Sequence, residues 1–166
     1  MPNSTAVHNT FVLERKLKAA PERVFAAFAS TETKRRWFFE STTHQLLHHE
    51  MDFTVGGAEH AQMKLSEGPV AGKIIANDQV YEDIQPNRRI VTAYRMSMDG
   101  RPFSVSLATI ELLPSDTGTD LILTHQVIYP EGADGPEMRK GGWEFCSPSW
   151  SMNLGSKCEA RRKTRT

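Results

Sequence analysis

The chain has 166 residues, 39% hydrophobic and 24% charged, which is typical of one globular domain that buries its own core. Basic and acidic residues each number 20, so the formal net charge is zero and the overall charge does not indicate a nucleic-acid partner. No apolar run approaches about 18 residues, and the N-terminus lacks the basic and apolar regions of a secretory signal. We therefore expect a cytoplasmic protein without membrane insertion.

The N-terminal part of the chain predicts a strand followed by a helix. Residues 1–8 are expected to form a flexible arm. Residues 9–19 alternate between apolar and polar side chains, as in a half-buried strand. A helix is predicted from Pro21, because proline suits the first helical turn and the following phenylalanines and alanines recur at helical spacing.

A second, short helix is predicted over residues 31–39. Ser30 or Thr31 is expected to cap its N-terminus, and the helix ends in the aromatic run "WFF". The polar segment 40–50 shows little periodicity, so we interpret it as a solvated connection.

From residue 51 onward, the sequence predicts an antiparallel meander of about six strands. The clearest hairpin signal is Asp99-Gly100, because Asp-Gly favours a two-residue hairpin turn. Gly56 and Gly57 indicate a sharp turn, since neither a G-x-G-x-x-G motif nor a P-loop lysine accompanies them. The predicted strands are residues 51–55, 59–65, 70–84, 89–98, 101–114 and 120–130.

The C-terminal segment does not match what such a sheet requires. One face of the sheet needs a cover, and a long helix would be expected after residue 136. The actual segment begins with "GGWE", but Pro148 and several serines and glycines oppose a helix. One hypothesis is a reading frame shifted within the codon of Phe145, because permitted codons would then encode a helix-forming terminus. A sheet face left uncovered would lower the stability, favour a homodimer through that face, or be covered by Trp143, Phe145, Trp150 and Met152.

We accordingly divide the chain into three parts. These are the arm at 1–8, a single domain at 9–144, and an atypical segment at 145–166 that replaces the expected helix.

Several short motifs follow one another in an order that resembles a known family. They are "APERVFAAFAS", "KRRWF", "DFTVGGAE", "GKIIANDQVYEDIQPNRRIVTAYRM", "SVSLATIELLPSDTGTDLILTHQ" and "GGWE". The chain resembles the SRPBCC or START-like superfamily, and within it proteins similar to the C-terminal domain of the activator of heat-shock-protein-90 ATPase. The resemblance implies an α+β helix-grip fold, with a curved antiparallel sheet of about six to seven strands, two short helices and a C-terminal helical element.

The resemblance also implies a range of functions. Members of the superfamily bind hydrophobic small molecules or lipids in a cavity between sheet and C-terminal helix, and we expect this activity first. The alternatives are a small cyclase or hydrolase that uses cavity residues, and a co-chaperone that acts on a chaperone ATPase. The seven candidate cavity residues are Trp37, Phe53, Tyr94, Met96, Phe103, His125 and Trp143.

Two of these candidates have competing interpretations. Trp37 would either contact a ligand at the cavity mouth or pack in the core, and core packing is favoured. His125 alternates in phase with Leu121 and Leu123, so it would be a buried polar group that needs a partner. There it would either bind or protonate a ligand or serve as a core histidine, and the second interpretation is favoured.

No metal, cofactor or catalytic constellation is expected from the sequence. His44, His48 and His49 with Glu50 lack the H-E-x-x-H order, and the two cysteines have no zinc-site spacing. No G-x-S-x-G elbow is present. The acidic residues Glu59, Glu82, Asp83 and Glu111 are interpreted as parts of solvated strand faces.

Overall fold

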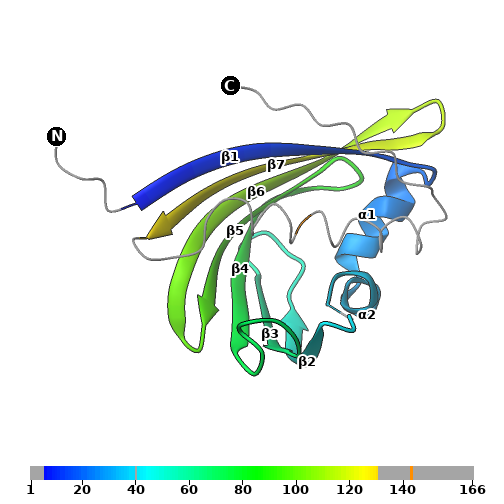
Figure 1. The fold of residues 1–166 in the computed structure, drawn as a ribbon. Coiled ribbons are helices and arrows are strands. Elements are labelled where there is room, and N and C mark those ends of the chain that lie inside the picture. Colours follow the sequence, from blue (N-terminus) through cyan, green and yellow to red (C-terminus); the bar gives the residue numbers. More distant parts are fainter. Residues whose placement is uncertain (1–5, 40, 131–142, 144–166) are drawn as a thin grey trace, which may run out of the picture.

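The computed structural model describes residues 6–39, 41–130 and Trp143. In this part of the chain, seven antiparallel strands form one curved sheet in the order β1-β7-β6-β5-β4-β3-β2, and two short helices lie on its concave side (Figure 1). The strands are β1 (Ala6–Leu17), β2 (His44–Met51), β3 (Ala58–Leu65), β4 (Ile74–Gln85), β5 (Arg89–Met98), β6 (Arg101–Ser115) and β7 (Gly118–Pro130). The predicted α+β helix-grip architecture is confirmed.

The predicted C-terminal features fall outside the described residues. The expected helix after residue 136, the atypical segment at 145–166 and the shifted reading frame all remain predictions.

The helical region begins where the sequence predicted it. Helix α1 (Pro21–Ala29) has its proline in the first turn and buries Val24 and Phe28. Helix α2 (Thr31–Lys34) is capped by the Ser30 hydroxyl, which accepts a hydrogen bond from the Thr33 amide at 3.2 Å. It continues into a π-helical turn, η1 (Arg35–Phe39), which carries the aromatic run.

Three predictions about strand positions were wrong. Strand β1 begins at Ala6 and pairs with β7 from there, so residues 6–8 belong to a strand and not to an arm. The segment interpreted as a connection contains strand β2, and residues 52–55, predicted as a strand, form a tight turn. A register shift in β2 between Leu46 and His48 breaks the alternation of its side chains, which explains why periodicity did not indicate a strand.

The glycine turns position the strands that form the site. Asp99 and Gly100 have φ values of 47° and 78°, as the predicted hairpin between β5 and β6 requires. Gly56 has a φ of 82°, and its amide donates to the Tyr81 carbonyl at 2.7 Å. The Tyr81 amide in turn donates to the Gly57 carbonyl at 3.0 Å. The turn after β2 is therefore attached to the middle of β4.

Candidate functional site

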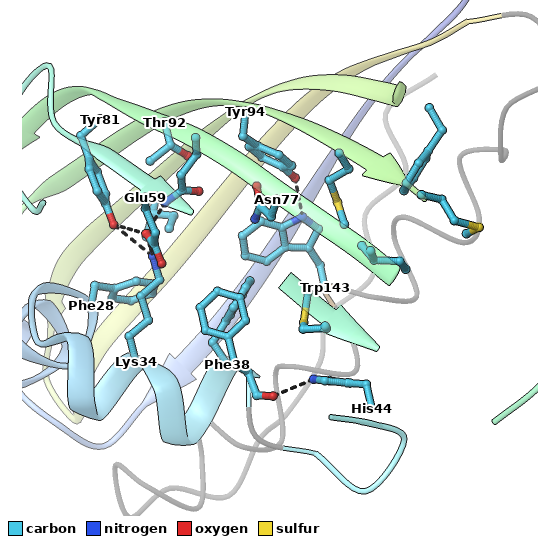
Figure 2. Close-up of a pocket in the computed structure, with 18 of the residues that line it drawn as sticks. Phe28, Lys34, Phe38, His44, Glu59, Asn77, Tyr81, Thr92, Tyr94 and Trp143 are labelled. Atoms are coloured by element: carbon cyan, nitrogen blue, oxygen red, sulfur yellow. Dashed lines mark hydrogen bonds and ion pairs between the residues drawn. The ribbon is translucent and has the colours of Figure 1, made fainter. Parts of the chain in front are cut away.

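A pocket of about 480 Å³ lies between the concave face of the sheet and the α2–η1 segment (Figure 2). Alternate residues of β3, β4 and β5 point into it, because successive side chains of a strand face opposite sides of a sheet. Most of its wall is apolar or aromatic, including Phe38, Phe53, Met63, Ile75, Met96 and Phe103.

A buried polar cluster forms one end of the pocket. Lys34 extends from α2 so that its Nζ lies 2.5 Å from Oε2 of Glu59 on β3, and the Glu59 side chain is only 2% exposed. Tyr81 Oη and Gln79 Nε2 also donate to this oxygen. His49 Nε2 lies 2.9 Å from the other carboxylate oxygen, Oε1. Figure 2 shows the Lys34 side chain extending from the helix to meet the Tyr81 and Glu59 side chains, which extend from the sheet.

The charges within this cluster stabilise each other. Burial alone would raise the pKa of Glu59, but the Lys34 charge and hydrogen bonds from His49, Lys34 and Tyr81 outweigh it and lower the pKa to about 2. Burial lowers the pKa of Lys34, an effect that the Glu59 carboxylate opposes. Burial and the neighbouring Glu59 charge raise the pKa of Tyr81. The cluster therefore holds an ionised carboxylate against an ammonium group.

A second group of polar side chains lies further along the pocket. Trp143 Nε1 donates to the Tyr94 hydroxyl at 3.2 Å (Figure 2). The same hydroxyl lies 2.5 Å from His125 Nε2. His125 is fully buried and stacks on Phe11 with ring centroids 4.7 Å apart. Trp143 also packs edge-on against Phe38, at 5.6 Å between ring centroids.

The structure separates the seven predicted cavity residues into two sets. Trp37 packs in the core, and its indole N–H donates to the Ala27 carbonyl at 2.9 Å. His125 faces inward with a polar partner, as predicted, but it lies behind Tyr94 and not on the pocket wall. The pocket wall includes Phe53, Tyr94, Met96, Phe103 and Trp143. Ligand contact by any of them stays a prediction.

The sequence-based interpretation missed the polar cluster. The assignment of Glu59 to a solvated face was wrong, because its side chain points into the concave side of the sheet. A signal was present in the sequence: Glu59 is in phase with Ala61 and Met63, so a charged residue occupies the apolar face of its strand. Lys34 had no comparable signal, since its partner lies 25 positions away.

The histidines of β2 do not form one site. His48 is 50% exposed beside Glu50, whereas His49 is 0% exposed and faces Glu59. The interpretation of this segment as solvated therefore holds for His48 and was wrong for His49. His44 lies on the pocket wall, with its Nε2 2.6 Å from the Phe39 carbonyl oxygen. In the part of the chain that the structure describes, no three His, Cys, Asp or Glu side chains are placed to hold a metal ion.

Among the residues that the structure describes, no helix is both long and apolar enough to cross a membrane.

Comparison with known proteins supports the fold and the family. None of the curated proteins compared with the chain matches it. A solved protein from Rhizobium leguminosarum is 35% identical, with a TM-score of 0.83 over 90% of this chain and 96% of its own. The Mll3558 protein from Rhizobium loti is 36% identical, with a TM-score of 0.80 over 91% of this chain and 100% of its own.

A more distant structure, the AHSA1-like protein from Aeromonas hydrophila, shares the fold. It is 14% identical, with a TM-score of 0.62 over 93% of this chain and 100% of its own. The model of one family, described as activator of Hsp90 ATPase homolog 1-like protein, matches residues 18–156, which is most of the chain. The chain therefore belongs to the family of activator of Hsp90 ATPase homolog 1-like proteins, within the START-like superfamily.

Proposed function

We propose that the protein binds a largely apolar small molecule or lipid in the pocket between the concave sheet face and the α2–η1 segment. The observation that carries this proposal is the pocket of about 480 Å³ with its mainly apolar wall and one polar end. This volume lies within the range of about 300–1,000 Å³ that is usual for small-molecule sites. Methionines on the wall, such as Met63 and Met96, would adapt to the shape of a ligand.

The polar cluster supports binding better than catalysis. A carboxylate has about four lone-pair positions, and Glu59 already receives four hydrogen bonds. Lys34, Gln79 and Tyr81 donate to Oε2, and His49 donates to Oε1. A general base needs a lone pair directed at the substrate proton. We therefore assign the cluster a positioning role at one end of the pocket, in preference to the cyclase or hydrolase chemistry considered from the sequence.

The other expectations draw on different observations. Action on a chaperone ATPase follows from the family resemblance and does not use the pocket. A cytoplasmic location and a homodimer likewise remain predictions.

Native mass spectrometry of the purified protein tests the proposal. We expect an adduct of small-molecule mass that disappears on denaturation and is extractable into organic solvent. The variant Met96→Trp would fill the pocket and reduce the adduct. Val105→Trp places the same bulk at an exposed position on strand β6, and it should leave the adduct intact. Equal adducts on both variants, or none on the wild type together with no binding of apolar probes, would overturn the proposal.

A further inference from the structure

We propose that the ligand is electrically neutral and carries a hydroxyl or carboxamide group that hydrogen-bonds to the side-chain amide of Asn77. This inference rests on the proposed function, because it specifies the chemistry of the molecule in the same pocket. It follows from two independent features of the wall: the balance of its charges and one polar side chain without a described partner.

The charges on the pocket wall compensate each other. Among the described residues of the wall, Lys34 and Glu59 carry opposite charges and lie 2.5 Å apart. The Glu59 oxygens are already occupied by Lys34, Gln79, Tyr81 and His49, and the Lys34 ammonium is shared between Glu59 and Tyr81. A charged ligand group would lose its hydration without gaining a free counter-charge, which disfavours its burial.

Asn77 is a polar side chain of the pocket wall with an unsatisfied hydrogen-bond acceptor. It lies on the pocket wall (Figure 2). It is the fourth residue of β4 and faces the same side of the sheet as Ile75 and Gln79. Its Oδ1 is buried and has no hydrogen-bond partner among the described residues. Its cross-strand neighbours on this face, Ala61 on β3 and Met96 on β5, have no hydrogen-bonding side chains to offer.

A buried amide without a partner costs free energy unless something satisfies it. An amide presents an acceptor and a donor side by side, and rotation about its last side-chain bond exchanges them. A hydroxyl or a carboxamide, which both donates and accepts, would satisfy either orientation. A hydrocarbon or an ionised carboxylate would not, since the first makes no hydrogen bond and the second only accepts.

Three probes of similar size and shape test this inference on the full chain at neutral pH: 2-naphthol, naphthalene and 2-naphthoate. Titration calorimetry of the wild type should give the tightest binding for 2-naphthol. We expect naphthalene to bind about three- to tenfold more weakly, the value of one hydrogen bond, and 2-naphthoate at least about tenfold more weakly. In Asn77→Leu, the preference for 2-naphthol over naphthalene should disappear while naphthalene binding is kept.

The control variant is Gln126→Leu, which removes an amide from an exposed position on β7. This control should keep the wild-type preference for 2-naphthol over naphthalene. If Asn77→Leu does not fold, Asn77→Ala takes its place as the test variant. Binding of 2-naphthoate as tightly as 2-naphthol, or an unchanged preference in both Asn77 variants, would overturn this inference and leave the proposed function standing. Absence of binding by all three probes would overturn this inference, and together with the absence of an adduct on the wild type it would overturn the proposed function as well.

Discussion

The ammonium group of Lys34 and the carboxylate of Glu59 form a buried ion pair, 2.5 Å apart, that connects helix α2 to strand β3. Removing one member of such a pair leaves an uncompensated buried charge, whereas removing both members does not. The pair therefore makes the stability of this fold sensitive to single charge changes at either position.

The first prediction compares single and double variants of this pair by urea unfolding. Lys34→Met and Glu59→Gln should each lower the free energy of unfolding by about 3–5 kcal/mol. The double variant should be more stable than either single variant. Lys73→Met is the control, because Lys73 pairs with Asp99 at 2.6 Å on the surface and its loss should cost less than about 1 kcal/mol. A double variant whose loss equals the sum of both single losses would contradict the coupling.

The second prediction concerns the dependence of stability on acid. The pKa of Glu59 is lowered from 4.5 to about 2 in the folded protein, so the folded state holds this carboxylate ionised more strongly than the unfolded state does. Its contribution is present above the unfolded pKa and is lost as the pH falls towards about 2. From this difference we expect a loss on the order of 3 kcal/mol.

Urea unfolding of the wild type and Glu59→Gln at several pH values measures this contribution. The stability difference between the two proteins should shrink as the pH falls from about 5 to about 2, since the wild type alone loses the contribution. A constant difference over this range would show that Glu59 does not titrate as described.

Local patterns in the sequence predicted much of the fold. The Asp99-Gly100 hairpin, the Ser30 cap and the inward-facing His125 depend on residues close together in the chain or on simple alternation. Strand β2 was missed because the register shift after Leu46 interrupts its alternation. A pattern with period two can indicate a strand only where the period is unbroken.

The candidate site was less accessible to sequence analysis, because its parts come from distant segments. Lys34 and Glu59 meet only after α2 folds onto the sheet, and no local rule pairs them. The position of Asn77 between Ala61 and Met96 depends on the register of three strands. Such register is set by turns and bulges along the whole sheet, which a single sequence does not specify in advance.

The third prediction concerns the Tyr94 hydroxyl, which bonds to both His125 and Trp143. In Tyr94→Phe, the buried imidazole loses this bond, and we expect a loss of about 1–3 kcal/mol in the free energy of unfolding. In a His125→Phe background the same change should cost clearly less, because no imidazole is present to lose the hydrogen bond. Unfolding of the four proteins of this cycle measures the coupling, and equal losses in both backgrounds would contradict it.

The fourth prediction concerns the turn between β2 and β3, where two adjacent glycines have different requirements. A Cβ on Gly56 would meet open space, so Gly56→Ala should cost only about 1–2 kcal/mol for its positive φ of 82°. A Cβ on Gly57 would lie 2.3 Å from the backbone oxygen of Asp52, so the turn itself must move. Because the Gly57 carbonyl accepts from the Tyr81 amide, this movement would displace the Tyr81 hydroxyl from Glu59.

We therefore expect Gly57→Ala to cost about 3 kcal/mol or more in urea unfolding and to weaken 2-naphthol binding. Gly56→Ala should leave that binding unchanged, which makes the pair of variants a matched test one residue apart. If both variants lost stability equally and bound 2-naphthol alike, the close approach at Gly57 would have no role in holding β4 and its pocket side chains in place.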